Sequence, residues 1–189
     1  MKVVNHEDIP VELDVINLVY SLKRRAVPEI VRQYPAFDNE EECHCKLALD
    51  GQLRGVLWAL GKDYRGKTIL DLGCGSNNPF LEGAGWFRDS MYEPWLCRSL
   101  FFLGANPMGI DIGRLDGEKF RYIRANLNKD NVLSSIPDSS VDLANAGQLF
   151  SSPLLRKMGI DSGELKRKLL PQLERVCKPD AYFLIREDA

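Results

Sequence analysis

Residues 67 to 189 alternate short apolar runs with helical segments, and this alternation limits the possible folds more than any other feature of the chain. Runs with the length and residue types of strands occur at 68–72, 107–112, 120–127, 141–146 and 182–186. Segments 93–103 and 164–177 have the spacing of amphipathic helices. Strands that alternate with helices form a mostly parallel sheet that is covered on both faces. The sequence therefore predicts a three-layer α/β sandwich.

The residues before this region are predicted to be helical. Apolar side chains recur at a helical spacing between Val11 and Tyr34, where Pro28 is expected to start a new turn or a kink. A second helix is expected from about Lys46 to Gly61, which would end it. We therefore expect two units, an N-terminal helical cap over residues 1–65 and a sheet domain over residues 66–189.

Composition and charge exclude several classes of protein. Hydrophobic residues make up 44% of the chain and charged residues 28%, which is typical of a globular domain and not of disorder. The 25 basic and 27 acidic residues give a net charge of -2, which argues against a nucleic-acid partner. No apolar run approaches the roughly 18 to 20 residues of a membrane helix. The N-terminus is too polar for a signal peptide, and five scattered cysteines favour a reducing, cytoplasmic setting.

Two acidic residues end neighbouring predicted strands, each beside glycines. The first strand ends in LDLGCGSN, in which Asp71 precedes Gly73 and Gly75. Glycines there permit a tight turn and let a ligand approach the backbone. The next strand ends in GIDIG, where the Asp111 carboxylate is placed to accept both hydroxyls of a ribose. Two alternatives stay open, namely that Asp71 accepts only its own loop's N–H groups and that Asp111 is a solvated loop residue.

Other site types have weaker support in the sequence. A nicotinamide-binding loop requires GxGxxG, whereas this loop reads GCGSNN and has asparagine at the last position. The run Cys43-His44-Cys45 lacks the spacing of a metal site, so no metal is expected. A serine hydrolase is disfavoured because the chain has only two histidines and no GxSxG elbow.

Over residues 66 to 187 the chain resembles the class I S-adenosylmethionine-dependent methyltransferases. Four segments resemble motifs of that family in the same order, namely TILDLGCGS, MGIDIG, IRANLN with IPDSSVDLANA, and LLPQLERVCKPDAYFLI. The resemblance implies a Rossmann-like sandwich with a shortened C-terminus, because the family usually adds two strands and a helix after the last motif. An open sheet edge would then pair with a second copy or a partner subunit.

The resemblance also implies which residues hold the cofactor, S-adenosyl-L-methionine. Asp71 and the glycines would line its methionine part, Asp111 would bind the ribose, and Ile112 would pack on the adenine. The complete set of implied cofactor-binding residues is Asp71, Gly73, Cys74, Gly75, Asp111, Ile112, Asn126, Leu127, Asn145 and Ala146.

The function that the resemblance implies is methyl transfer to an acceptor, which we expect to be a small molecule. Trp86, Tyr92, Glu93 and Gln148 are the candidate acceptor-binding residues. The aromatic residues among them would either face a flat acceptor or pack the loop onto the N-terminal helices. No catalytic acid or base is identified, since such transfer depends mainly on positioning. The alternative is a non-catalytic S-adenosylmethionine-binding or scaffold domain that acts through a protein partner.

Overall fold

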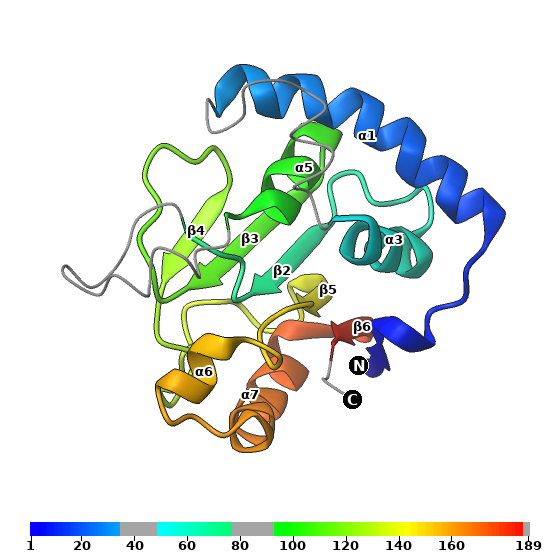
Figure 1. Ribbon diagram of the computed structural model, residues 1–189. Coiled ribbons are helices and arrows are strands. Elements are labelled where there is room, and N and C mark those ends of the chain that lie inside the picture. The colour runs from blue at the N-terminus through cyan, green and yellow to red at the C-terminus, as the bar shows by residue number, and fades with distance from the viewer. Residues whose placement is uncertain (35–48, 77–92, 187–189) are drawn as a thin grey trace.

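The computed structural model describes residues 1–34, 49–76 and 93–186 of the chain (Figure 1). Its six strands form one sheet in the order β1-β6-β5-β2-β3-β4, and every neighbouring pair is parallel. The strands are β1 (Lys2–Asn5), β2 (Thr68–Leu72), β3 (Asn106–Asp111), β4 (Arg121–Arg124), β5 (Val141–Ala146) and β6 (Cys177–Ile185). The predicted α/β fold with a mostly parallel sheet is thereby confirmed.

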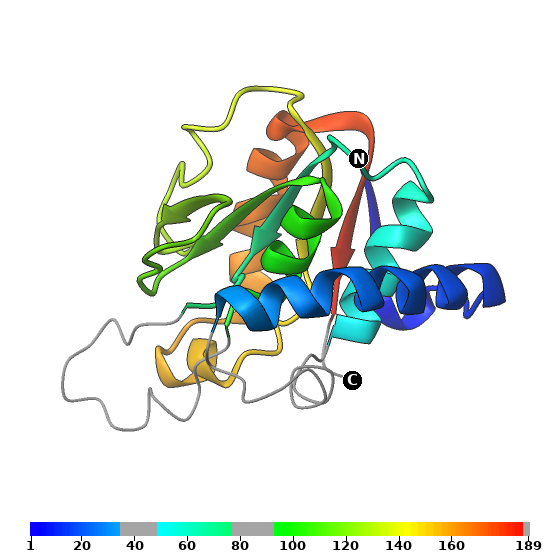
Figure 2. The ribbon, with the colours of Figure 1, turned by 90° about the horizontal axis from the view of Figure 1, so that it is seen from above.

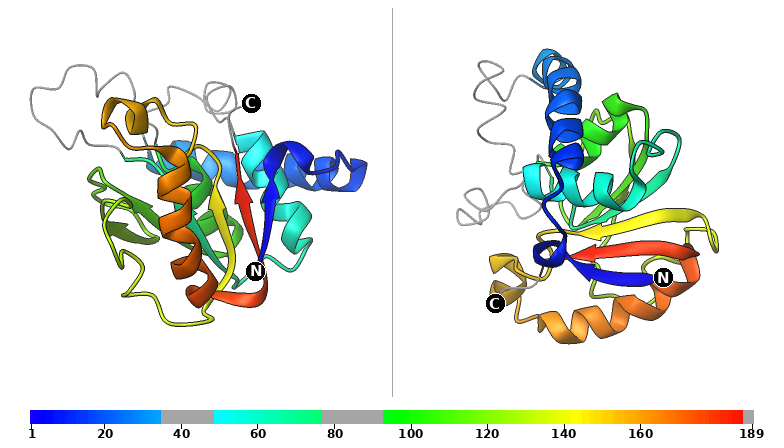
Figure 3. Two further views of the ribbon diagram at one scale, coloured as in Figure 1. Left: turned by 90° about the horizontal axis from the view of Figure 1, so that it is seen from below. Right: turned by 90° about the vertical axis from the view of Figure 1, so that its right-hand side faces the viewer.

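Helices cover both faces of the sheet, which gives the three predicted layers (Figure 3). One face carries α1 (Leu13–Gln33), α3 (Leu49–Leu60) and α5 (Trp95–Leu103), and the other carries α7 (Ser162–Val176). The 3-10 helix η1 (His6–Asp8) follows β1, and the short helix α6 (Pro153–Lys157) lies between β5 and α7. Among the helices of the described residues, none is long and apolar enough to cross a membrane.

The central strands β2 and β5 are largely apolar because both of their faces are buried. In β2, Ile69 packs into the core formed with α1, α3 and α5, whereas Leu70 and Leu72 pack into the core formed with α7. Successive side chains of a strand point to opposite faces, so each core receives alternate residues. The β2 strand is thus held from both sides, and its end has a fixed position in the sheet.

The N-terminal segment begins with a strand, although the sequence predicts only helices there. Strand β1 pairs in parallel with β6, with Val4 opposite Leu184, and lies beside it in Figure 2. It occupies the sheet position next to β6 that the sequence analysis expects to be open. The strand β1 has only four residues, and their side chains are partly exposed, so its sequence shows no clear alternation of apolar and polar residues. Its partner β6 lies at the other end of the chain.

Pro28 neither ends nor restarts the first helix, since α1 runs without a break from Leu13 to Gln33. Pro28 and Arg24 are both exposed, so the carbonyl that loses its hydrogen bond faces water. The opposite side of α1 buries Val27 and Ile30 completely. We infer that this burial outweighs the missing hydrogen bond and keeps the helix continuous.

Candidate ligand-binding site

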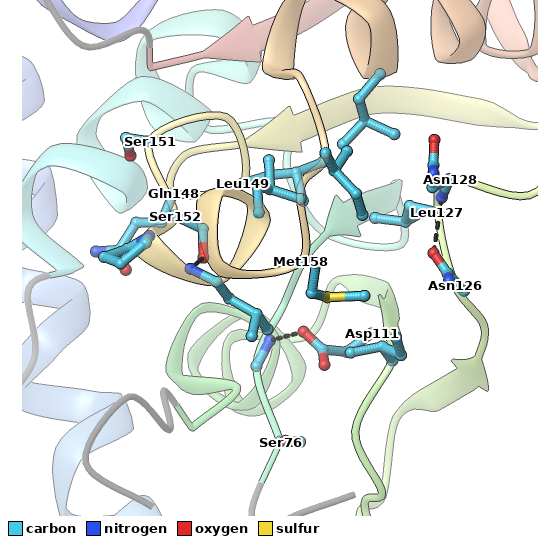
Figure 4. A pocket seen from close by; sticks show the side chains of 18 of the residues that line it. Ser76, Asp111, Asn126, Leu127, Asn128, Gln148, Leu149, Ser151, Ser152 and Met158 are labelled. Carbon is cyan, nitrogen blue, oxygen red and sulfur yellow. Dashed lines mark hydrogen bonds between the residues drawn. The ribbon is translucent and has the colours of Figure 1, made fainter. Parts of the chain in front are cut away.

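A cavity of about 350 Å³ lies at the carboxyl ends of the central strands. The glycine loop after β2, the tip of β3, the segment after β4 and the segment from β5 to α6 form its walls (Figure 4). The lining includes six residues that the sequence analysis assigns to the cofactor, namely Gly73, Gly75, Asp111, Ile112, Asn126 and Leu127. Cavities of this size and position hold small molecules in parallel α/β proteins.

Asp111 joins the tips of β2 and β3 through its carboxylate. One oxygen, Oδ1, accepts the N–H of Gly113 at 2.8 Å, and Oδ2 accepts the N–H of Gly75 at 3.0 Å. Burial raises the pKa of Asp111 above its ordinary value, while these two backbone N–H groups act in the opposite direction. Each carboxylate oxygen has two acceptor positions, so both can still receive a ligand hydroxyl. The carboxylate is therefore held by the protein, and it still has acceptor positions for a ligand.

The glycine loop adopts a backbone conformation that requires glycine. Gly73 and Gly75 have φ angles of 68° and 100°, which L side chains rarely adopt. The N–H groups of Gly73 and Cys74 both donate to the carbonyl of Ile110, at 2.8 and 3.2 Å. A Cβ atom on Gly73 would lie 3.1 Å from Cδ1 of Leu149. The loop is thus tied to β3 and passes closely under the segment that follows β5.

We expect Gly113→Ala to lower the free energy of unfolding by about 1 to 3 kcal/mol, as overpacking does elsewhere. The new Cβ atom would lie 2.1 Å from Oγ of Ser76 and 2.3 Å from its Cβ, so the glycine loop must move. Chemical denaturation measures the loss. Adding Ser76→Gly removes both clashing atoms and should restore part of the stability. A double variant no more stable than the single one would contradict this explanation.

Asp71, which is predicted to hold the cofactor, is not among the residues that line the cavity. Its side chain is buried, with Oδ1 accepting from Nδ2 of Asn145 at 2.7 Å and Oδ2 from the thiol of Cys97 at 3.7 Å. Asp71 and Asn145 stand opposite each other in the register of β2 and β5. Burial raises the pKa of Asp71 to about 7. Both of these donors lie outside the loop that follows Asp71, Asn145 on β5 and Cys97 on α5.

The same buried network extends to His6 on η1. Asn145 donates its amide group to Asp71, so its Oδ1 accepts from Nε2 of His6 at 2.8 Å. Burial lowers the pKa of His6, which favours the neutral imidazole, and a proton on Nε2 is what this contact with Asn145 requires. The sequence alone predicts no role for His6. Only the pairing of β1 with β6 brings it beside Asn145, and no local pattern signals that pairing.

The remaining predicted site residues fall into four groups. Gln148 lines the cavity, whereas Cys74, Asn145 and Ala146 are buried and do not line it. Glu93 forms an ion pair with Arg98. The predicted acceptor-binding residues Trp86 and Tyr92 lie outside the described residues, as do the three residues 43–45. Within the described ranges, no group of three or more His, Cys, Asp or Glu residues is placed to hold a metal ion.

A charged cluster centred on Arg98, separate from the network of Asp71, joins α5 to the end of α1. The Arg98 side chain is 1% exposed and pairs with Glu93 and with the buried Glu118. Its guanidinium lies 3.7 Å from the ring centroid of Tyr34 and 4.5 Å from that of Trp95. The Tyr34 hydroxyl donates to Glu118 at 2.7 Å. The sequence alone does not predict this cluster, because its members come from separate segments of the chain.

No protein-family model matches the chain, and neither does any curated protein sequence. What the fold and the site define is an α/β protein with a small-molecule cavity at the carboxyl edge of a parallel sheet.

Proposed function

We propose that the protein binds S-adenosylmethionine in this cavity and transfers its methyl group to a small-molecule acceptor. The observation that carries the proposal is that Asp111, the glycine loop and Leu127 line one cavity at the carboxyl edge of the sheet. These residues come from three different strand ends, and the motif order in the sequence assigns all of them to the same cofactor.

The residues of the cavity fit the parts of this cofactor. Asp111 would accept the ribose hydroxyls, and Ile112 and Leu127, which line the same cavity, offer apolar surface to the adenine. Asn126 uses its Oδ1 to accept the N–H of Asn128 at 2.9 Å, so its amide nitrogen stays available as a donor. Gly73 and Gly75 would let the methionine part approach the backbone without a Cβ in the way.

When bound, S-adenosylmethionine supplies a methyl group on a positively charged sulfur. The chain would position the cofactor and the acceptor, which can lower the activation barrier by several kcal/mol. Leu149, Leu155 and Met158 line the side of the cavity formed by α6 and the residues around it, where they would exclude water from the ligand. Gln148, which follows β5, is the described residue best placed to face an acceptor.

We expect Asp111→Ala to weaken the binding of S-adenosylhomocysteine by about 1 to 3 kcal/mol, roughly five- to 150-fold. The variant loses the acceptor for the ribose and also leaves the N–H groups of Gly75 and Gly113 without a partner. Titration calorimetry with S-adenosylhomocysteine measures the change. Asp116→Ala is the matched control, because Asp116 is an exposed carboxylate on the same loop and does not line the cavity. Equal affinity in wild type and Asp111→Ala would remove the ribose assignment.

A second candidate function is a binding domain without catalysis that acts through a protein partner. One observation favours it: Asp111 and Arg186 are the two ionisable side chains among the described lining residues, and neither is placed as a base toward an acceptor. One measurement distinguishes the two functions. Formation of S-adenosylhomocysteine from S-adenosylmethionine in the presence of candidate acceptors would support the enzyme, whereas tight binding without any turnover would support the binding domain.

A further inference from the structure

The cavity has opposite charges on two sides. Asp111 belongs to the tip of β3, whereas Arg186 directly follows β6. Two strands, β5 and β2, lie between β6 and β3 in the sheet order, so the two backbone positions are about 14 Å apart at the usual strand spacing. Between them the lining offers mainly apolar side chains with a few hydroxyl and amide groups. In Figure 4, Gln148, Ser151 and Ser152 lie on the side of the cavity opposite Asn126.

We propose that Arg186 binds the carboxylate of the ligand's amino-acid part, and that it thereby selects an amino-acid-bearing nucleoside over a plain nucleoside. This inference rests on the proposed function and names a selectivity residue within the same site. A volume of about 350 Å³ suits one small ligand, so the two charged sides belong to a single molecule. That molecule carries hydroxyl groups toward Asp111 and an anionic group toward Arg186.

Arg186 is available for this role. Its present partner is Glu7 on η1, with Nε of Arg186 3.8 Å from Oε1 of Glu7, and both side chains are more than half exposed. Exposed ion pairs of this kind contribute little and exchange readily. A ligand carboxylate inside the cavity would be better desolvated than Glu7 and would match the planar guanidinium with two hydrogen bonds.

Two ligands separate the carboxylate contact from the rest of the site. S-adenosylhomocysteine carries the amino-acid part, and methylthioadenosine has the same nucleoside without it. Calorimetry with both ligands on wild type and on Arg186→Gln gives four affinities. We expect the variant to lose about tenfold for S-adenosylhomocysteine and nothing for methylthioadenosine. Arg186→Lys should recover part of the loss, since it keeps the charge but not the paired hydrogen bonds.

Arg156→Gln is the matched control, because it makes the same charge change on the exposed side of α6 and Arg156 does not line this cavity. It should behave as wild type with both ligands. If wild type binds both ligands and Arg186→Gln keeps the wild-type ratio of the two affinities, the role of Arg186 is wrong while the nucleoside site stands. If wild type binds neither ligand, the proposed function fails, and this inference fails with it.

Discussion

Asp71→Asn is expected to stabilise the folded protein at pH 8 by about 4 kcal/mol and to leave its stability almost unchanged near pH 3. The pKa of Asp71 is about 7 in the folded chain and near 3.8 when exposed. Between these values the folded state binds more protons than the unfolded state, so the stability of the wild type falls as the pH rises through this window. At about 1.36 kcal/mol per pH unit, the burial of an ionised Asp71 accounts for the expected difference.

Asparagine fits the position because it keeps the main contact. Its carbonyl oxygen accepts from Nδ2 of Asn145 as the carboxylate does, and its amide group faces the thiol of Cys97. Urea denaturation at a series of pH values measures the effect.

Asp142→Asn is the contrasting control. Burial raises the pKa of Asp142, but hydrogen bonds from Lys178 and from the N–H of Thr68 outweigh it and lower the pKa below the ordinary value. The effect of the substitution on stability therefore has the opposite sign to that of Asp71→Asn. A depressed folded pKa stabilises the protein above the unfolded pKa, so this variant should lose stability at pH 7. Parallel curves for wild type and Asp71→Asn across pH 4 to 8 would show that Asp71 is not the buried acid described here.

Arg98→Met should cost about 3 to 5 kcal/mol of unfolding free energy, the effect seen when one partner of a buried ion pair is removed. Arg98 and Glu118 are 1% and 3% exposed, so the variant leaves the Glu118 carboxylate buried with only the Tyr34 hydroxyl as a described donor. The two cation–π contacts to Tyr34 and Trp95 are lost as well. Denaturant unfolding measures the change directly.

The same measurement on two further variants separates charge from packing. Arg98→Met with Glu118→Gln removes the uncompensated charge and should recover much of the loss. Arg114→Met breaks the exposed pair with Asp116 and should change stability by less than about 1 kcal/mol. If Arg98→Met and Arg114→Met cost the same, the Arg98 cluster does not hold α1 against α5 in the way the contacts indicate.

The sheet and its ligand edge are predictable from sequence for a local reason. Strands such as β2 and β5 are buried on both faces, so their apolar runs stand out, and the residues after them fall at one edge. Asp111, Ile112, Asn126, Leu127 and Gln148 meet at the cavity because each ends or follows a strand of the parallel sheet. Their convergence follows from parallel topology alone.

The buried polar contacts are not predictable in this way. His6 and Asn145 are 139 positions apart, and Arg98 on α5 is 20 positions from Glu118, which lies between β3 and β4. Such pairs depend on which segments become neighbours in the sheet and on how far each side chain is desolvated. The placement of Asp71 illustrates this, because its position at the end of β2 follows from the sequence, whereas its contact with Asn145 depends on the β2–β5 register.

The most direct test of the nucleoside site is a titration of nitrogen-15-labelled protein with S-adenosylhomocysteine, followed by amide resonances. We predict saturable shifts at Gly75, Ile112 and Leu127, which surround the cavity, and unchanged resonances for Val19 and Ala26 on α1. Resonances that stay unchanged at the cavity throughout the titration, or that change only on α1, would contradict the assignment of this cavity to S-adenosylmethionine.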